Sequence, residues 1–249
     1  MKPHSDVVII GGGIAGSAAA IRLARAGYAV TVLEKEADYV DRVRGECMVH
    51  WGYEQAIAMG IGDILGGTPG ASFVTRLMAY DETLPLEVAQ ARAHSMAGLV
   101  EGIPGLFCAG HVDMREQLSA EAERAGATFL RDVDHVEVQP GERPMVSFEH
   151  DGIKHQLSAN LVLVADGKNS RIRKALGITL HTSGPWACLA GLLIDDGGLW
   201  DRAETTQSVF GENLIYVMPR GDNLSRIYIT RTMDNPNRFT GEGKEQRML

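Results

Sequence analysis

A glycine-rich turn between a short apolar strand and an alanine-rich helix constrains this chain more than any other feature of its sequence. Residues 6–10 predict a strand buried on both faces, because they are apolar and β-branched. Residues 11–16 have the spacing G-x-G-x-x-G, and residues 17–26 favour a helix that ends at Gly27. A second strand at residues 29–33 completes a βαβ unit of the kind that binds dinucleotides.

Each glycine of this turn has a physical role in holding a dinucleotide. Gly11 allows the tight turn, Gly13 lets the backbone approach a pyrophosphate, and Gly16 lets the helix pack close to the strand. The free N–H groups at the helix N-terminus attract the phosphates. Glu34, which follows the second strand, can accept hydrogen bonds from both ribose hydroxyls and would repel a 2′-phosphate, so FAD or NAD is expected rather than NADP. The other expected contacts of this unit are Ile14, Ala15 and Lys35.

Two further segments carry a resemblance to a known family. An apolar strand at residues 160–165 leads into D-G-x-x-S-x-x-R at residues 166–173, and residues 44–46 read Arg-Gly-Glu. With the glycine-rich turn, these segments resemble the FAD-dependent aromatic hydroxylases, the para-hydroxybenzoate hydroxylase-like group of flavoprotein monooxygenases. The resemblance covers residues 5 to about 178 and continues more loosely to about 232. It favours FAD over NAD.

The resemblance implies several contacts with FAD outside the first βαβ unit. Arg44 would approach the pyrophosphate or a ribose of the cofactor. Asp166 would hydrogen-bond the ribityl chain, and Gly167 would give the backbone room beside it. Val133 is expected in a segment whose backbone touches the adenine.

The start of a helix near residue 111 is the expected position of a contact beside the flavin. Members of the resembled family carry an arginine or a glutamine there, whereas this chain has His111. Arg115, one helical turn later, is the alternative. A histidine at a helix start is also an ordinary capping or surface residue.

The rest of the chain predicts an antiparallel sheet built from two separate stretches. Residues 71–80 read as one strand, and short β-like runs follow at 186–194, 207–210, 214–218 and 226–230, with a hairpin turn at 221–223. The expected fold is α/β, with a Rossmann-like FAD-binding domain containing a parallel sheet and a smaller antiparallel β-sheet substrate domain. The expected boundaries are 1–70 and 96–178 for the FAD-binding domain, 71–95 and 179–232 for the substrate domain, and 233–249 for a polar tail or unfinished helix.

The resemblance implies that the second domain forms a substrate pocket over the flavin. Arg220 and Tyr228 have a spacing similar to that of the arginine and tyrosine that grip para-hydroxybenzoate in that hydroxylase. Met218 replaces the serine that accompanies that arginine, which argues against the same substrate, and a surface position is the simpler interpretation of Arg220. Aromatic and methionine side chains of these strands line either such a pocket or an ordinary core: Trp186, Phe210, Tyr216, Met218 and Tyr228.

No catalytic side chain and no metal site are expected, because a bound flavin carries the difficult chemistry itself. His150 and His155 flank a predicted turn without a third ligand, which indicates a solvated pair. Cys47, Cys108 and Cys188 are far apart and have no C-x-x-C spacing, so neither a disulfide framework nor a zinc site follows.

Composition and charge exclude several classes of protein. The formal charge is −8, from 24 Lys and Arg against 32 Asp and Glu, which argues against nucleic-acid binding. No apolar run approaches the ~20 residues that a membrane span needs. No cleavable signal precedes the first strand, so a reducing, cytoplasmic location is expected.

The resemblance implies an FAD-dependent monooxygenase that hydroxylates a small aromatic or polyketide-like substrate through a peroxyflavin, with NADH or NADPH as transient reductant. A flavin-dependent reductase of the geranylgeranyl reductase type shares the R-G-E and D-G motifs, and a non-catalytic binding module could use the same fold. A flavin-dependent halogenase fits less well, because no lysine lies between Lys35 and Lys154. The family's third flavin motif, G-D-A, is not found, so an oligomeric partner or a missing C-terminal segment is expected to complete the flavin site.

Overall fold

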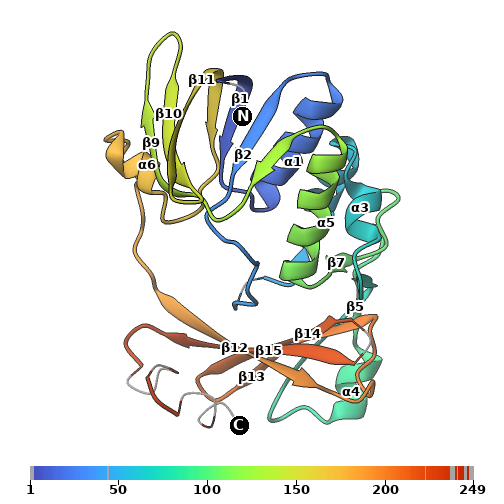
Figure 1. Cartoon of the computed structure of the whole chain (residues 1–249). Coiled ribbons are helices and arrows are strands. Elements are labelled where there is room, and N and C mark those ends of the chain that lie inside the picture. The colour runs from blue at the N-terminus through green and yellow to red at the C-terminus, as the bar shows by residue number, and fades with distance from the viewer. Residues whose placement is uncertain are drawn as a thin grey trace. The chain divides into compact units, whose positions relative to one another are not determined.

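The computed structural model describes residues 3–43, 45–221, 223–235, 239, 241–243 and 246. The chain forms two compact units (Figure 1). The first unit comprises Met1–Val40, Met59–Leu65 and Val112–His181, and the second comprises Asp41–Ala58, Gly66–His111 and Thr182–Leu249. These units differ from the expected domain boundaries mainly in residues 41–58 and 96–111, which the second unit contains. The reason is a pairing of β3 (Cys47–Met48) with β7 (Leu106–Cys108). Most of the expected tail at 233–249 lies outside the described residues.

The first unit is built on a six-stranded sheet with the strand order β8-β2-β1-β11-β10-β9. Its parallel strands are β1 (His4–Ile10), β2 (Val30–Leu33), β8 (Thr128–Leu130) and β11 (Ile153–Val164). Its antiparallel strands are β9 (Asp134–Gln139) and β10 (Met145–His150). Its helices are α1 (Ile14–Arg25), α5 (His111–Arg124) and α6 (Arg171–Ala175).

The apolar run of the first strand places it at the centre of this sheet. Val8 and Ile9 are fully buried, and β1 pairs with β2 on one edge and β11 on the other. The strand expected at 160–165 is the second half of a longer strand. β11 begins at Ile153 and forms a hairpin with β10 around Asp151 and Gly152, which both have positive φ angles. One core cluster of this unit consists of Val8, Ile10, Leu33, Val133, Val146, Phe148, Leu157, Ala159 and Ile172.

The second unit contains a six-stranded sheet and a three-stranded sheet. The larger sheet has the order β12-β15-β14-β13-β5-β6, with β12 (Ala187–Asp195), β15 (Leu224–Thr232), β14 (Asn213–Arg220), β13 (Glu204–Phe210), β5 (Arg76–Asp81) and β6 (His94–Ser95). The smaller sheet pairs β7 with β3 and with β4 (Ser72–Val74). The remaining helices are α2 (His50–Ala58), α4 (Leu86–Ala91) and α3 (Gly62–Gly66), which crosses the boundary between the units.

The single strand expected at residues 71–80 was wrong, because the structure divides it between two sheets. β4 joins the smaller sheet and β5 joins the larger one. The chain changes direction at Thr75, whose N–H donates to the carbonyl of Ala203 rather than to a neighbour of β4. β5 also runs parallel to β13, so the larger sheet is not antiparallel throughout. The predicted α/β class is confirmed, although the first sheet is mixed rather than parallel throughout, because β9 and β10 are antiparallel.

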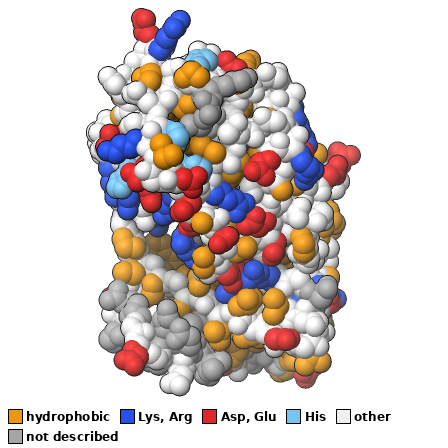
Figure 2. Space-filling model, viewed as in Figure 1, with side chains coloured by type: hydrophobic (Ala, Val, Ile, Leu, Met, Phe, Trp, Pro, Cys, Tyr) orange, Lys and Arg blue, Asp and Glu red, His pale blue; other side chains and the backbone are white. Residues whose placement is uncertain are grey.

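Acidic and basic side chains lie interspersed on the face of the molecule that Figure 2 shows. The ion pairs of the described residues include Arg131–Glu116, with an N–O distance of 2.7 Å. Among the described residues, no helix combines the length and the apolar character that crossing a membrane requires.

Candidate functional site

The glycine-rich turn joins β1 to α1, and two of its glycines are required by close packing. A Cβ at Gly11 would overlap the carbonyl oxygen of Ala165, and a Cβ at Gly16 would overlap the carbonyl oxygen of Gly11. Gly11 also has a φ of +102°, which favours glycine. Gly13 differs, because a Cβ there would meet no heavy atom within 4 Å. The turn therefore leaves open space beside the Gly13 backbone.

The N-terminus of α1 is available to an anion. Gly13 occupies the N-cap position, makes no side-chain capping hydrogen bond, and is followed by a first turn without an acidic residue. The first N–H groups of a helix have no partner within the helix, and they carry about half a positive charge together. A pyrophosphate fits both this charge and the space beside Gly13.

Glu34 lies at the carboxyl end of β2 and is held firmly against the glycine-rich turn. Its side chain is buried, its Oε2 accepts a hydrogen bond from the Gly12 N–H at 2.6 Å, and its Oε1 accepts one from the Glu36 N–H at 2.9 Å. The backbone N–H of Val133 donates to the Glu34 carbonyl at 3.0 Å. The structure thus brings together three of the predicted contact regions: the turn, the acid and the segment around Val133.

Arg115 reaches the same acid from α5. Its Nη2 lies 3.8 Å from the Glu34 Oε2, and its Nη1 donates to the Glu36 carboxylate at 3.0 Å. The guanidinium stacks over the ring of Tyr39 at 3.6 Å from the ring centroid. The buried Nε of Arg115 has no hydrogen-bond partner among the described residues. This orphaned donor is a feature that a bound nucleotide could satisfy.

Sequence reasoning missed Glu36 and Tyr39 as members of this cluster. The Tyr39 hydroxyl donates to the Gly12 carbonyl at 2.9 Å, and burial raises the pKa of this hydroxyl. Arg131 also lies over the Tyr39 ring, 4.3 Å from its centroid. No local pattern marks Tyr39, because its partners come from α5 and from the end of β8.

The D-G-x-x-S-x-x-R segment lies at the carboxyl end of β11, directly against the glycine-rich turn. The Ala165 N–H donates to the Ile10 carbonyl at 2.8 Å, which joins the ends of β11 and β1. The Asp166 Oδ2 accepts from the Arg171 N–H at 3.0 Å, and the Ser170 Oγ accepts from the Arg173 N–H at 3.0 Å. Both acceptors therefore cap α6, which gives this motif a local structural role. A contact of Asp166 with the ribityl chain stays a prediction.

The other predicted contacts are dispersed. Ile14 is half-buried, whereas Ala15, Lys35 and Gly167 are exposed. His111 is the half-buried first residue of α5 and belongs to the second unit. Arg44 lies outside the described residues.

The second unit has an open cavity of about 200 Å³. The residues that line it are Gly45, Glu46, Cys47, Leu189, Tyr216, Met218 and Tyr228. The cavity contains Tyr228, the predicted substrate residue, and two other side chains that were candidates for a pocket, Tyr216 and Met218. It also contains the last two residues of the R-G-E segment.

Glu46, which lines this cavity, belongs to a network of ion pairs. The Arg226 Nε donates to the Glu46 Oε1 at 2.9 Å, and the Arg226 Nη2 donates to Asp41. The Arg220 Nη1 also donates to Asp41, at 2.9 Å. The Arg220 side chain is only 11% exposed, so its expected surface position was wrong. Two arginines and two carboxylates balance in charge, which leaves no net cation in this group.

The two carboxyl groups of the network differ in their electrostatics. Burial raises the pKa of Glu46 above its usual value, although Arg226 opposes this effect. At Asp41, burial acts in the same direction, but the hydrogen bonds from Arg226 and Arg220 outweigh it and lower the pKa. The Glu46 Oε2 is buried without a hydrogen-bond partner among the described residues.

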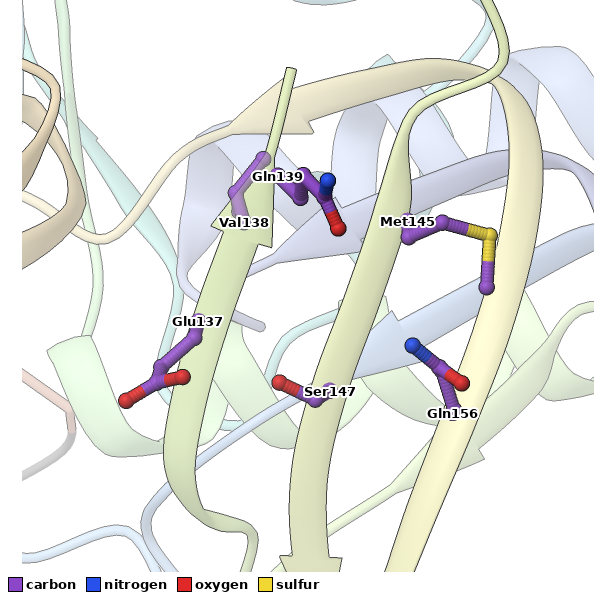
Figure 3. A pocket seen from close by; sticks show the side chains of 6 residues that line it. All are labelled: Glu137, Val138, Gln139, Met145, Ser147 and Gln156. Carbon is purple, nitrogen blue, oxygen red and sulfur yellow. The ribbon is translucent and has the colours of Figure 1, made fainter. Parts of the chain in front are cut away.

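A second, shallow cavity of about 130 Å³ lies across β9, β10 and β11 in the first unit. Figure 3 shows the side chains that line it, spread over three neighbouring strands: Glu137, Val138, Gln139, Met145, Ser147 and Gln156. It contains none of the predicted cofactor contacts.

Residues 4–236 match a family model described as an FAD binding domain. The chain belongs to this family. Family membership confirms FAD as the dinucleotide, and the glycine-rich turn, the buried acid and the free helix N-terminus of the first unit fit that cofactor. The chain's curated relatives include flavoprotein monooxygenases, which confirms the predicted likeness to that class.

Among curated relatives, the chain is 30% identical to mouse squalene monooxygenase over 69% of this chain and 30% of that protein. It is 25% identical to aklavinone 12-hydroxylase of Streptomyces peucetius over 78% of this chain and 42% of that protein. The fold is similar to that of p-nitrophenol 4-monooxygenase of Pseudomonas putida, with a TM-score of 0.81 and 18% identity over 100% of this chain and 62% of that one. The chain spans less than half the length of these curated relatives.

Proposed function

We propose that this chain is the FAD-binding part of a flavin-dependent monooxygenase that hydroxylates a small aromatic or polyketide-like substrate, with NADH or NADPH as reductant. The observation that carries the proposal is the convergence of the glycine-rich turn, Glu34 and Asp166, which follow the carboxyl ends of β1, β2 and β11 respectively. In open α/β sheets, ligands bind beside the carboxyl ends of the parallel strands. The proposed substrate class, small aromatic or polyketide-like molecules, is supported by the names of similar proteins, aklavinone 12-hydroxylase and p-nitrophenol 4-monooxygenase.

The first unit would hold the cofactor through backbone and side-chain groups with separate roles. The N–H groups at the start of α1 and the space beside Gly13 would receive the pyrophosphate. The Glu34 carboxylate would accept hydrogen bonds from the hydroxyls of the adenosine ribose. Arg115 would stabilise the negative charge of this carboxylate. Asp166 and the backbone of Gly167 would contact the ribityl chain. The bound flavin would supply the redox and oxygen chemistry, so no acid or base is required from this chain.

The cavity of the second unit would hold the substrate. Its wall includes Leu189, Met218 and two tyrosines, which favour an apolar or aromatic ring. Arg220 is paired with Asp41, and Arg226 is paired with both Asp41 and Glu46. Since these cations are already neutralised, an uncharged ring is a better ligand for this cavity than an aromatic carboxylate.

The first experiment measures the visible absorbance of the purified chain with and without added FAD. A retained flavin spectrum is expected, and a Gly13→Val variant should lose it because the side chain would fill the space for the pyrophosphate. Gly141→Val is the matched control, because a Cβ at Gly141 also meets no atom within 4 Å and this glycine has no positive φ. Equal flavin content in the two variants would refute the assignment of this site.

The second experiment measures consumption of NADH and NADPH in the presence of aromatic and polyketide substrates, with and without oxygen. Hydroxylation requires oxygen and incorporates one of its atoms, which ¹⁸O₂ labelling followed by mass spectrometry detects. Oxygen-independent reduction of an alkene would replace the proposal with a reductase of the geranylgeranyl reductase type. If the chain binds FAD but converts neither class of substrate, this result would contradict the proposal that residues 1–249 are active on their own.

A further inference from the structure

The cysteines of the smaller sheet face each other across two antiparallel strands. In the pairing of β3 with β7, Cys47 is the direct partner of Cys108. The neighbouring residues form the hydrogen-bonded pair, because the Ala109 N–H donates to the Glu46 carbonyl at 3.0 Å. Hydrogen-bonded and non-hydrogen-bonded pairs alternate along antiparallel strands, so Cys47 and Cys108 occupy a non-hydrogen-bonded pair.

This type of pair has the geometry that a disulfide requires. In a non-hydrogen-bonded pair the Cα atoms lie about 4.5 Å apart, and the side chains point to the same face of the sheet. Disulfides span Cα separations of roughly 4.4–6.8 Å. A bond between the two sulfur atoms therefore needs no rearrangement of the backbone. Both cysteines are free thiols in the structure.

The two thiols differ in access and in acidity. Cys108 is fully buried, whereas Cys47 is half-buried and lines the cavity of the second unit. A hydrogen bond from the Cys108 thiol lowers the pKa of Cys47, and the same bond together with burial raises the pKa of Cys108. The thiolate is the reactive form of cysteine, so Cys47 is the thiol that an oxidant from the cavity would meet first.

We propose that Cys47 and Cys108 are a redox-active pair that forms a reversible disulfide with a hydroperoxide as the oxidant. The Cys47 thiolate attacks one peroxide oxygen, which breaks the O–O bond, gives a sulfenic acid and releases water or an alcohol. The Cys108 sulfur then attacks the Cys47 sulfur, the S–O bond breaks and water leaves. The two thiols lose two electrons in total, and the peroxide gains them. Neither step needs FAD or substrate, so the inference is independent of the proposed function.

The site differs from a single oxidation-prone cysteine because its resolving thiol is already in place. A sulfenic acid without a neighbouring thiol proceeds to sulfinic and sulfonic acids, which are not reversed by ordinary thiols. Disulfide formation would link β3 covalently to β7 and hold the Cys47 sulfur against the Cys108 sulfur. Because Cys47 lines the cavity, this movement would change the cavity wall. A dithiol reductant restores the original state.

The test is a peptide map of the full chain after treatment with hydrogen peroxide and alkylation of the remaining thiols under denaturing conditions. We expect the tryptic peptides 45–76 and 93–115 to become cross-linked, and the number of alkylatable thiols to fall from three to one. The remaining thiol should be Cys188, which lies on β12 opposite Arg231 and serves as the internal control. Dithiothreitol should return the number of thiols to three.

Two variants separate the steps. In Cys108→Ala, dimedone should label the sulfenic acid of Cys47 on peptide 45–76, since no resolving thiol remains. Cys188→Ser should form the same cross-link as the wild type. Over-oxidation of Cys47 in the wild type with Cys108 still reduced, or a cross-link that involves Cys188 instead, would overturn the proposal. An unchanged number of thiols at peroxide concentrations that oxidise a free cysteine would overturn it as well.

Discussion

Replacement of Glu34 by glutamine tests the centre of the dinucleotide site with the smallest change in shape. The carboxylate accepts two backbone N–H bonds, from Gly12 at 2.6 Å and from Glu36 at 2.9 Å. A glutamine side chain has one acceptor oxygen and one NH2 group, so it can accept only one of these bonds. The NH2 group then faces the other N–H, and one buried donor is left without an acceptor.

The expected loss of stability follows from this mismatch. A buried unsatisfied donor costs about 1–3 kcal/mol. At this chain length each kcal/mol corresponds to a shift of roughly 2–4 °C in the unfolding temperature, so Glu34→Gln should unfold about 2–12 °C below the wild type. FAD affinity should fall too, because a neutral amide binds the ribose hydroxyls less strongly than a carboxylate does.

The assay combines thermal unfolding of the chain without FAD and a titration of FAD followed by its fluorescence. Glu137→Gln is the control, since this carboxylate is exposed on β9, outside the dinucleotide site. The reasoning is refuted if the two variants have the same unfolding temperature and the same FAD affinity.

Three further outcomes follow from the packing and charges described above. Gly16→Ala should fail to fold or lose FAD, because its Cβ would overlap the Gly11 carbonyl, whereas Gly141→Ala should behave as the wild type in circular dichroism and flavin content. Arg226→Met should cost about 3–5 kcal/mol in urea unfolding, because it leaves Glu46 buried without its partner, while Arg76→Met at an exposed ion pair should cost at most about 1 kcal/mol. Because burial raises the pKa of Glu46, its folded form holds the proton more tightly than the unfolded chain, so its ionisation lowers stability as the pH rises above about 4.5. Glu46→Gln should make unfolding less dependent on pH in that range, and an unchanged pH profile would contradict the assignment.

The first unit could be predicted in large part because its signals are local. The spacing of Gly11, Gly13 and Gly16, the apolar strand before them and the acid after the second strand all lie within about thirty residues. The role of Gly16 depends on a neighbour close in the sequence, the Gly11 carbonyl, whereas the close packing of Gly11 against Ala165 could not be seen in the sequence. The long-range elements of the prediction, such as the D-G segment and Arg115, were supplied by the resemblance rather than by spacing.

The second unit and the ion pairs could not be predicted in the same way. Residues 71–80 combine apolar and β-branched residues with Ser72, Thr75 and Arg76, and nothing in this pattern shows that Thr75 turns the chain from one sheet into another. Arg226 pairs with Glu46 across 180 residues of sequence, and Arg115 pairs with Glu36 across 79. Which opposite charges meet is decided by the folded chain, so composition predicts that such pairs exist but not which ones.

The position of β1 between β2 and β11 has a consequence for how the chain reaches this structure. β1 is complete at Ile10, whereas its partner β11 ends at Val164. At a synthesis rate of about 5–20 residues per second, one edge of this apolar strand waits roughly 8–30 s on the ribosome for its partner. Non-local pairing of this kind also slows refolding of the whole chain. An uncovered strand edge pairs readily with other chains. Expression at low temperature or with added chaperones should therefore raise the yield of folded protein more than changes at its surface.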